Sequence, residues 1–125
     1  MVKYFSDEFF KEVETRLTGD ANWQQATKGV MSSIRLGVTD SGLNYLIRIE
    51  NGSTAIARSD PNTQAEFSFE GTYEVWTRVA KGELDLQSAV LKGLLKFKGS
   101  ITKILFYKDR FVRIADTIKS VHTEF

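Results

Sequence analysis

The stretch from Ser33 to Ser59 is the part of the sequence that most restricts how this chain can fold. Apolar residues alternate with polar or small ones over 33–39, 44–50 and 53–59, which is the period of a strand with one buried face. Turn residues separate these runs, and the second turn, Asn51-Gly52, is well suited to a tight hairpin because both of its central residues need a positive φ. The stretch therefore predicts three consecutive antiparallel strands.

The rest of the sequence predicts two more strands and several helices. Alternation recurs at 65–70 and 94–98. Apolar residues at helical spacing predict helices over 7–18, 22–28, 73–81 and 86–92, and one long closing helix from Ser100 to Val121. The expected fold class is α+β, with a five-stranded, mostly antiparallel sheet and helices layered on one face. No linker, repeat or low-complexity tract divides the chain, so a single domain over 1–125 is expected.

The side chains that catalysis and metal binding most often use are scarce. The chain has no Cys and one His, His122, which argues against a disulfide framework, a thiolate nucleophile and a cysteine- or histidine-rich metal site. His122 lies near a terminus where fraying is expected, and the acidic residues lie at turns, helix starts or the exposed face of a strand. We therefore expect no catalytic residue, no metal and no cofactor.

The charge is unevenly distributed although the net charge is only +1. Residues 1–91 contain 9 Lys and Arg against 13 Asp and Glu, whereas residues 92–125 contain 8 against 3. The basic group Lys92, Lys96, Lys98 and Lys103 suits transient contact with an anionic membrane surface, although lysines on an exposed strand also protect a sheet edge. We expect no nucleic-acid partner. No signal peptide or membrane span is recognisable, so a cytoplasmic location is expected.

The apolar residues are the informative ones, and they include nine Phe, four Tyr and two Trp. In the closing helix, Phe106, Tyr107 and Val112 lie outside the main apolar stripe, which indicates a second apolar partner. A neighbouring helix or a homodimer would satisfy that requirement. The rings that face the sheet suit either a close-packed core or the walls of a pocket, and the periodicity leaves both open.

Two segments of the sequence resemble the sterol carrier protein type 2 domain family. The first is Gly82-Glu83-Leu84-Asp85, which follows a short helix containing Trp76. The second is Gly93-Leu94-Leu95-Lys96-Phe97-Lys98-Gly99, with Leu94 where the family usually has Lys and Phe97 where it usually has a β-branched residue. The hairpins before these motifs and the helix after them also follow the family's order, most clearly from Ile34 to Ile118.

The resemblance implies an intracellular lipid-binding or lipid-transfer protein. In this family an apolar tunnel between sheet and helices accepts a fatty acid, a fatty acyl-CoA or a sterol-like ligand, and the domain itself is not an enzyme. The residues that the resemblance implies as tunnel walls come from the first helix, the sheet face and the later helices: Phe9, Val13, Ile34, Leu36, Ile47, Ile49, Phe67, Phe69, Trp76, Leu105, Phe106 and Phe111. Each of them is also suited to a core.

Two alternatives stay open. A small α+β isomerase or hydrolase could use the same pocket with a carboxylate base, which requires a buried acid or Tyr with a raised pKa. A non-catalytic, dimeric interaction subunit could instead use Phe106, Tyr107 and Val112 as its contact surface.

Overall fold

The computed structural model describes residues 2–121 and 123–125 and confirms the α+β class and the five-stranded sheet. The helices are α1 (Asp7–Thr18), α2 (Ala21–Thr27), α3 (Tyr73–Ala80), α4 (Leu86–Leu91), α5 (Ile101–Phe106) and α6 (Lys108–Ser120). The strands are β1 (Val2–Lys3), β2 (Met31–Val38), β3 (Asn44–Glu50), β4 (Ser53–Ser59), β5 (Phe67–Gly71), β6 (Lys96–Lys98) and β7 (Thr123–Glu124). Most of these ranges agree with the predicted ones, with small shifts at their ends.

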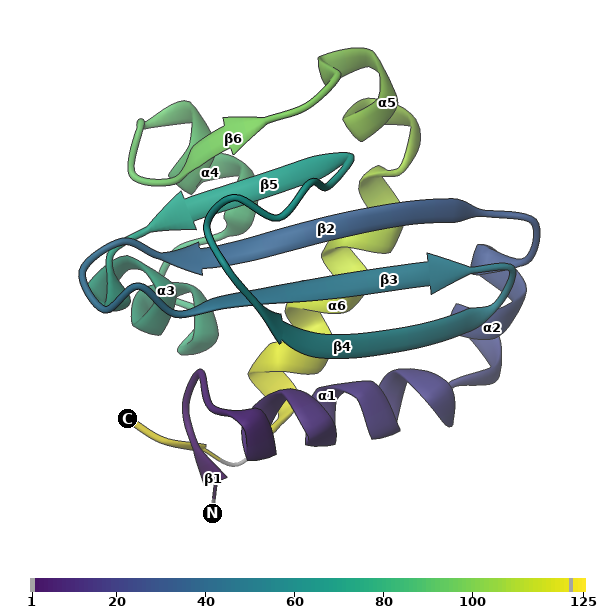
Figure 1. Ribbon diagram of the computed structural model, residues 1–125, viewed down its shortest axis with the longest axis horizontal. Helices are drawn as coiled ribbons and strands as arrows, with labels where there is room; N and C mark the ends of the chain where they lie inside the picture. Colours follow the sequence, from purple (N-terminus) through teal and green to yellow (C-terminus); the bar gives the residue numbers. More distant parts are fainter. Residues whose placement is uncertain (1, 122) are drawn as a thin grey trace.

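The main sheet has the order β4-β3-β2-β5-β6 (Figure 1). The three predicted strands form the antiparallel half, and Asn51 and Gly52 carry the β3–β4 turn with φ of 47° and 87°. Within the main sheet, as far as the structure describes it, only the β2–β5 pair is parallel, and a parallel pair requires a crossover between its strands. The connection from β4 to β5 makes this crossover over the outer face of the sheet, in front of β3 and β2 in Figure 1.

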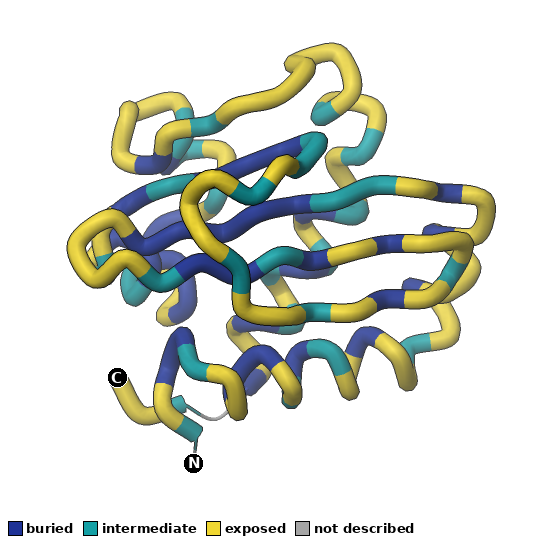
Figure 2. The backbone as a smooth tube through the Cα atoms, viewed as in Figure 1, coloured by how far each residue is buried: buried dark blue, intermediate teal, exposed yellow. Residues whose placement is uncertain are grey.

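The core lies between the inner face of the sheet and the helices behind it (Figures 1 and 2). Alternate residues of the central strands point into this layer and are buried, among them Ile34, Ile47 and Phe67. Helix α6 closes the layer with Phe111, Ile114 and Ile118, which are buried and share one helix face through their spacing of three and four. The layer between sheet and α6 is therefore the place to search for a ligand site.

The prediction of one long closing helix is wrong, because the helix breaks at Tyr107. The backbone there has φ −96° and ψ 12°, so α5 ends and α6 begins at this residue. The ring of Tyr107 packs edge-on against Phe67, with 6.2 Å between ring centroids, while the side chain of Phe106 remains exposed. The sequence has no Pro or Gly at this point, so the break comes from tertiary packing rather than from a helix-breaking residue.

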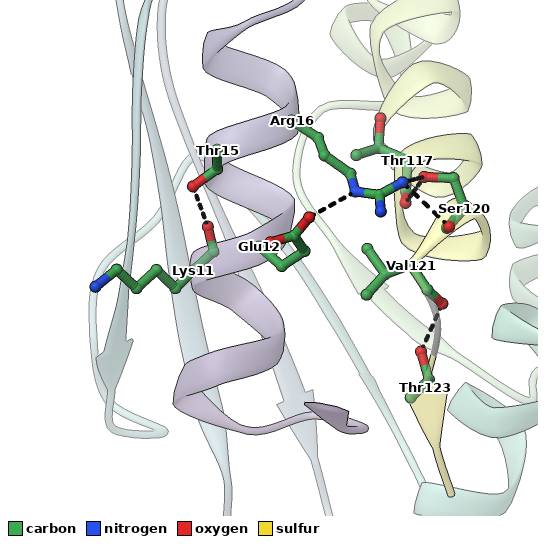
Figure 3. A network of polar contacts seen from close by, with 8 residues as sticks. All are labelled: Lys11, Glu12, Thr15, Arg16, Thr117, Ser120, Val121 and Thr123. Atoms are coloured by element: carbon green, nitrogen blue, oxygen red, sulfur yellow. Dashed lines mark hydrogen bonds and ion pairs between the residues drawn. The ribbon is translucent and has the colours of Figure 1, made fainter. Parts of the chain in front are cut away.

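The C-terminal residues Thr123 and Glu124 form a short strand, β7, that the sequence did not predict. Strand β7 pairs in parallel with β1, and the backbone N–H of Tyr4 donates to the carbonyl of Glu124 at 2.9 Å. Nearby, Arg16 of α1 donates to the side chain of Glu12 and to both the carbonyl and the hydroxyl of Ser120, at the end of α6 (Figure 3). A guanidinium at this position donates to a carbonyl that has no partner within the helix. Its positive charge also interacts favourably with the negative end of the helix dipole. His122 lies outside the described residues.

Candidate functional site: an apolar slot between the sheet and helix α6

A narrow slot opens between the sheet and α6, where β2 begins and β3 ends. Its walls combine residues from before β2, from both strands and from the start of α6: Val30, Ser32, Ile34, Ile49, Tyr107, Arg110, Phe111 and Ile114. The open volume inside it is about 10 Å³, the size of one water molecule. Ligand pockets usually measure about 300–1,000 Å³. The layer is therefore nearly closed in this structure.

The walls of the slot are apolar and belong to the main core. Ile34 and Ile49 come from the sheet, and Phe111 and Ile114 face them from α6. The ring of Phe111 packs edge-on against Phe67 and Phe69, with centroid distances of 5.3 and 5.8 Å. The slot is thus continuous with a group of rings held between β5 and α6.

One cation stands among the residues that line the slot. The guanidinium of Arg110 lies 4.9 Å from the centroid of the Tyr107 ring, and its Nε donates to the carbonyl of Ala26 at 2.9 Å. The hydroxyl of Ser32, also in the lining, donates to Glu66 at 2.7 Å. Arg110 is half-buried and is the residue of the lining best able to bind an anionic group.

The structure brings together only part of the predicted site. Ile34, Ile49 and Phe111 line the slot. Seven further residues lie in the surrounding core without lining it: Phe9, Val13, Leu36, Ile47, Phe67, Phe69 and Trp76. Leu105 and Phe106 are 65% and 79% exposed. The expectation that these two side chains line an interior wall does not hold in this conformation, because the break at Tyr107 turns α5 away from the core.

Sequence reasoning missed Val30, Ser32, Tyr107, Arg110 and Ile114 as lining residues. One signal could have identified Arg110. It stands one helical turn before Ile114, so a charged residue shares the edge of an otherwise apolar helix face. A lone cation at that position is a reason to look for an anionic partner.

Trp76 and Phe9 belong to a different part of the core, which we call the aromatic cluster. Its members are Tyr4, Phe5, Phe9, Phe10, Tyr45 and Trp76. The indole N–H of Trp76 donates to the carbonyl of Gly37 at 2.9 Å, and the hydroxyl of Tyr4 donates to the carbonyl of Trp76 at 2.7 Å. These bonds hold Trp76 within the aromatic cluster.

Several groups in and beside this cluster have shifted pKa values, among them Tyr45, whose pKa burial raises. Burial raises the pKa of Tyr4 above its ordinary range. A hydrogen bond from the hydroxyl of Tyr45, 2.7 Å long, lowers the pKa of Asp7, and the guanidinium of Arg58 beside it acts in the same direction. Neither Tyr4 nor Asp7 lines the slot.

A second hollow, of about 250 Å³, lies at the same end of β2 and β3. It is wide open, and its lining includes the charged side chains of Arg48, Glu50 and Glu66, so it does not suit an apolar chain. Within residues 2–121 and 123–125, no group of three or more His, Cys, Asp or Glu residues is placed to hold a metal ion. In the same part of the chain, no helix is long and apolar enough to cross a bilayer.

The comparison with protein families identifies one family. The model of the SCP-2 sterol transfer family matches residues 10–110. No curated protein sequence matches the chain. A crystal structure of sterol carrier protein 2 superposes with a TM-score of 0.83 at 19% identity, covering 96% of this chain and 100% of that one.

Two further solved structures have the same fold. The solution structure of a conserved hypothetical protein from Thermus thermophilus, described as possibly a sterol carrier protein, gives a TM-score of 0.81 at 19% identity over 99% of this chain and 93% of that one. Sterol carrier protein 2 from Aedes aegypti, solved with palmitate, gives a TM-score of 0.59 at 20% identity over 90% and 98%. At these identities the structures demonstrate a shared fold.

Proposed function

The chain belongs to the SCP-2 sterol transfer family, and from this premise we propose that it binds an amphipathic lipid and transfers it between sites. The observation that carries the proposal is the apolar slot between the sheet and α6, with Ile34 and Phe111 on opposite walls and a single cation in its lining. Burial of an acyl chain contributes about 0.8 kcal/mol of binding free energy per methylene group. An apolar layer can therefore bind such a ligand with no polar contact beyond that to the cation.

The ligand we propose has one acyl chain and an anionic head, as in a fatty acid or a fatty acyl-CoA. Arg110 supports this choice, because its Nε is engaged by Ala26 while its terminal nitrogens make no further bond among the described residues. A guanidinium held in this way can bind a carboxylate or phosphate through two parallel hydrogen bonds. A sterol, whose hydroxyl is neutral, would gain less from Arg110.

Loading requires the slot to widen, since its present volume is far smaller than a lipid chain. Widening the slot requires the least free energy on the side that adjoins α5. Helix α5 has no buried residue, and Tyr107 joins it to the slot lining. Movement of α5 together with Tyr107 would separate the start of α6 from β2 without exposing the aromatic cluster.

We further propose that the domain is not an enzyme. The alternative of an isomerase or hydrolase needs a titratable group with a raised pKa against the pocket. Burial does raise the pKa of Tyr4, but its hydroxyl is bonded to the Trp76 carbonyl within the aromatic cluster. Among the described residues, no Asp or Glu lines the slot. The cytoplasmic location stays a prediction of the sequence.

The test is a titration of the purified full chain with palmitate, the palmitate methyl ester and cholesterol, read by native mass spectrometry. We expect a one-to-one complex with palmitate, and an affinity that falls about fourfold for each methylene removed from the chain. Arg110→Gln should weaken palmitate binding by about tenfold and leave ester binding unchanged. Arg110→Lys, which keeps the charge, should recover part of the loss.

Lys119→Gln is the matched control, because it removes a positive charge from the same helix far from the slot lining. A folded protein that binds none of the three lipids would contradict the proposed function. Equal losses for palmitate and its ester in Arg110→Gln would contradict the role of Arg110 in binding the head group.

A further inference from the structure

Three apolar side chains are exposed on α5. They are Ile101, Leu105 and Phe106, and we call them the α5 apolar face. Helix α5 contains no buried residue and lies with β6 at the upper edge of the molecule in Figure 1, where Figure 2 shows an almost continuous exposed trace. An exposed ring such as Phe106 next to exposed Leu and Ile side chains is unfavourable in water and indicates a contact surface.

The chain segment that carries the α5 apolar face is basic. The segment 92–108 contains five lysines, Lys92, Lys96, Lys98, Lys103 and Lys108, and no Asp or Glu. All five are exposed. Lys103 lies 3.1 Å from Glu66 of the neighbouring chain segment, a surface pair that solvent screens strongly. The segment therefore combines exposed apolar side chains with exposed positive charge.

We propose that this surface docks on an anionic lipid bilayer, with Phe106 and its apolar neighbours at the level of the head groups. Exposed apolar residues on a lysine-rich segment match an interface whose surface is negative and whose interior is apolar. Charge decides against a second copy of this chain, because a symmetric pair through this face would bring Lys103 and Lys108 of one copy close to those of the other. Neither of the two hollows described above is lined by a residue of the face.

The docking face adjoins the slot. Tyr107 ends α5 and lines the slot, and its ring rests on Phe67. A bilayer that binds α5 would therefore act directly on the residue that closes the slot. The physiological purpose of docking rests on the proposed function, whereas the surface itself is defined by exposure and charge alone.

The experiment is co-sedimentation of the full chain with two kinds of vesicle, phosphatidylcholine alone and phosphatidylcholine mixed with phosphatidylglycerol. We expect binding to the mixed vesicles only, weakening as salt is raised. The double variant Leu105→Ser/Phe106→Ser should reduce this binding by about tenfold or more, and Lys96→Glu/Lys98→Glu by at least as much.

The matched controls are exposed residues outside the face. Val112→Ser removes a half-exposed apolar side chain from α6, and Lys3→Glu/Lys11→Glu reverses two lysines near the N-terminus. Neither should change vesicle binding. Circular dichroism and palmitate titration in vesicle-free buffer should show that every variant remains folded and binds ligand as the parent does.

Equal binding to both kinds of vesicle, or equal losses in the face and control variants, would overturn the docking proposal. A dimer in vesicle-free buffer that Leu105→Ser/Phe106→Ser dissociates would assign the face to a second copy instead. Vesicle binding without palmitate binding would refute the proposed function and leave the docking surface standing. Palmitate binding without vesicle binding would overturn the docking proposal and leave the proposed function standing.

Discussion

The aromatic cluster and the α5 apolar face use the same kinds of side chain in opposite ways. In the cluster, six rings from segments between β1 and α3 pack with centroid distances of 4.2–5.8 Å, and none is more than 2% exposed. In the α5 apolar face, Ile101 and Phe106 are 68% and 79% exposed. The cluster contributes to the stability of the fold, while the face contributes almost nothing to it. Contact with a bilayer, as proposed above, would remove these exposed side chains from water.

The slot is intermediate between the aromatic cluster and the α5 apolar face in how tightly its side chains are packed. Its wall residues Ile34 and Phe111 are packed as in the cluster, whereas Tyr107 connects it to a helix that packs as weakly as the face. A binding site at such a boundary has one rigid wall and one wall that can move. This arrangement suits a ligand that must enter and leave.

The largest effect on stability is expected in the aromatic cluster. Phe10→Ala removes a fully buried ring that contacts Phe5, Phe9 and Tyr45, so it should lower the free energy of unfolding by about 3–5 kcal/mol. Urea denaturation followed by tryptophan fluorescence measures this change. A loss below about 1 kcal/mol would show that the cluster is not the rigid half of the molecule.

A smaller, pH-dependent effect is expected where β5 meets β2. Glu70 accepts a hydrogen bond from the buried guanidinium of Arg35 at 2.8 Å, and this bond lowers the pKa of Glu70 below its ordinary value near 4.5. The native state therefore favours ionised Glu70, and the resulting stability is present above about pH 4.5 and is lost as the pH falls through the lowered value.

Glu70→Gln should reduce the free energy of unfolding at neutral pH by about 1–3 kcal/mol. The difference from the parent should shrink as the pH drops below about 4.5. Denaturation curves measured across this range would detect it. A difference that stayed constant with pH would show that Arg35 does not depend on the charge of Glu70.

The smallest effect is expected at the α5 apolar face. Phe106→Ala should change the free energy of unfolding by no more than about 0.5 kcal/mol, because the ring is mostly in solvent. The same denaturation assay used for Phe10→Ala gives a direct comparison of the two regions. A loss as large as that of Phe10→Ala would mean that Phe106 is buried in solution, and would remove the basis for a docking surface.

Local patterns in the sequence were sufficient to predict most of the helices and strands. The alternation around Asn51-Gly52 correctly predicted three strands, and Asp7–Thr18 formed the predicted helix with Ser6 as its N-cap. The break at Tyr107 was not predictable, because no local signal opposes a helix there. The pairing of β7 with β1 was missed for a similar reason, since it joins short segments from the two ends of the chain.

The candidate site was predictable only in part. Periodicity identified Ile34, Ile49 and Phe111 as inward-facing, and the structure places them in the slot. It could not separate slot residues from core residues such as Trp76, because both face inward with the same period. Leu105 and Phe106 were expected in the tunnel wall because of the family resemblance, although periodicity placed Phe106 outside the main apolar stripe.

The sequence alone thus determined which residues of β2, β3 and α6 face inward, the family resemblance and the excess of positive charge in the last third of the chain. These properties depend on local order and composition, which need no knowledge of distant contacts. Only the tertiary structure decided where α5 points, which inward side chains meet at the slot and that Arg110 stands beside it. Those outcomes depend on how β2, β3 and α6 pack together. A local sequence pattern does not specify how segments far apart in the chain pack against one another.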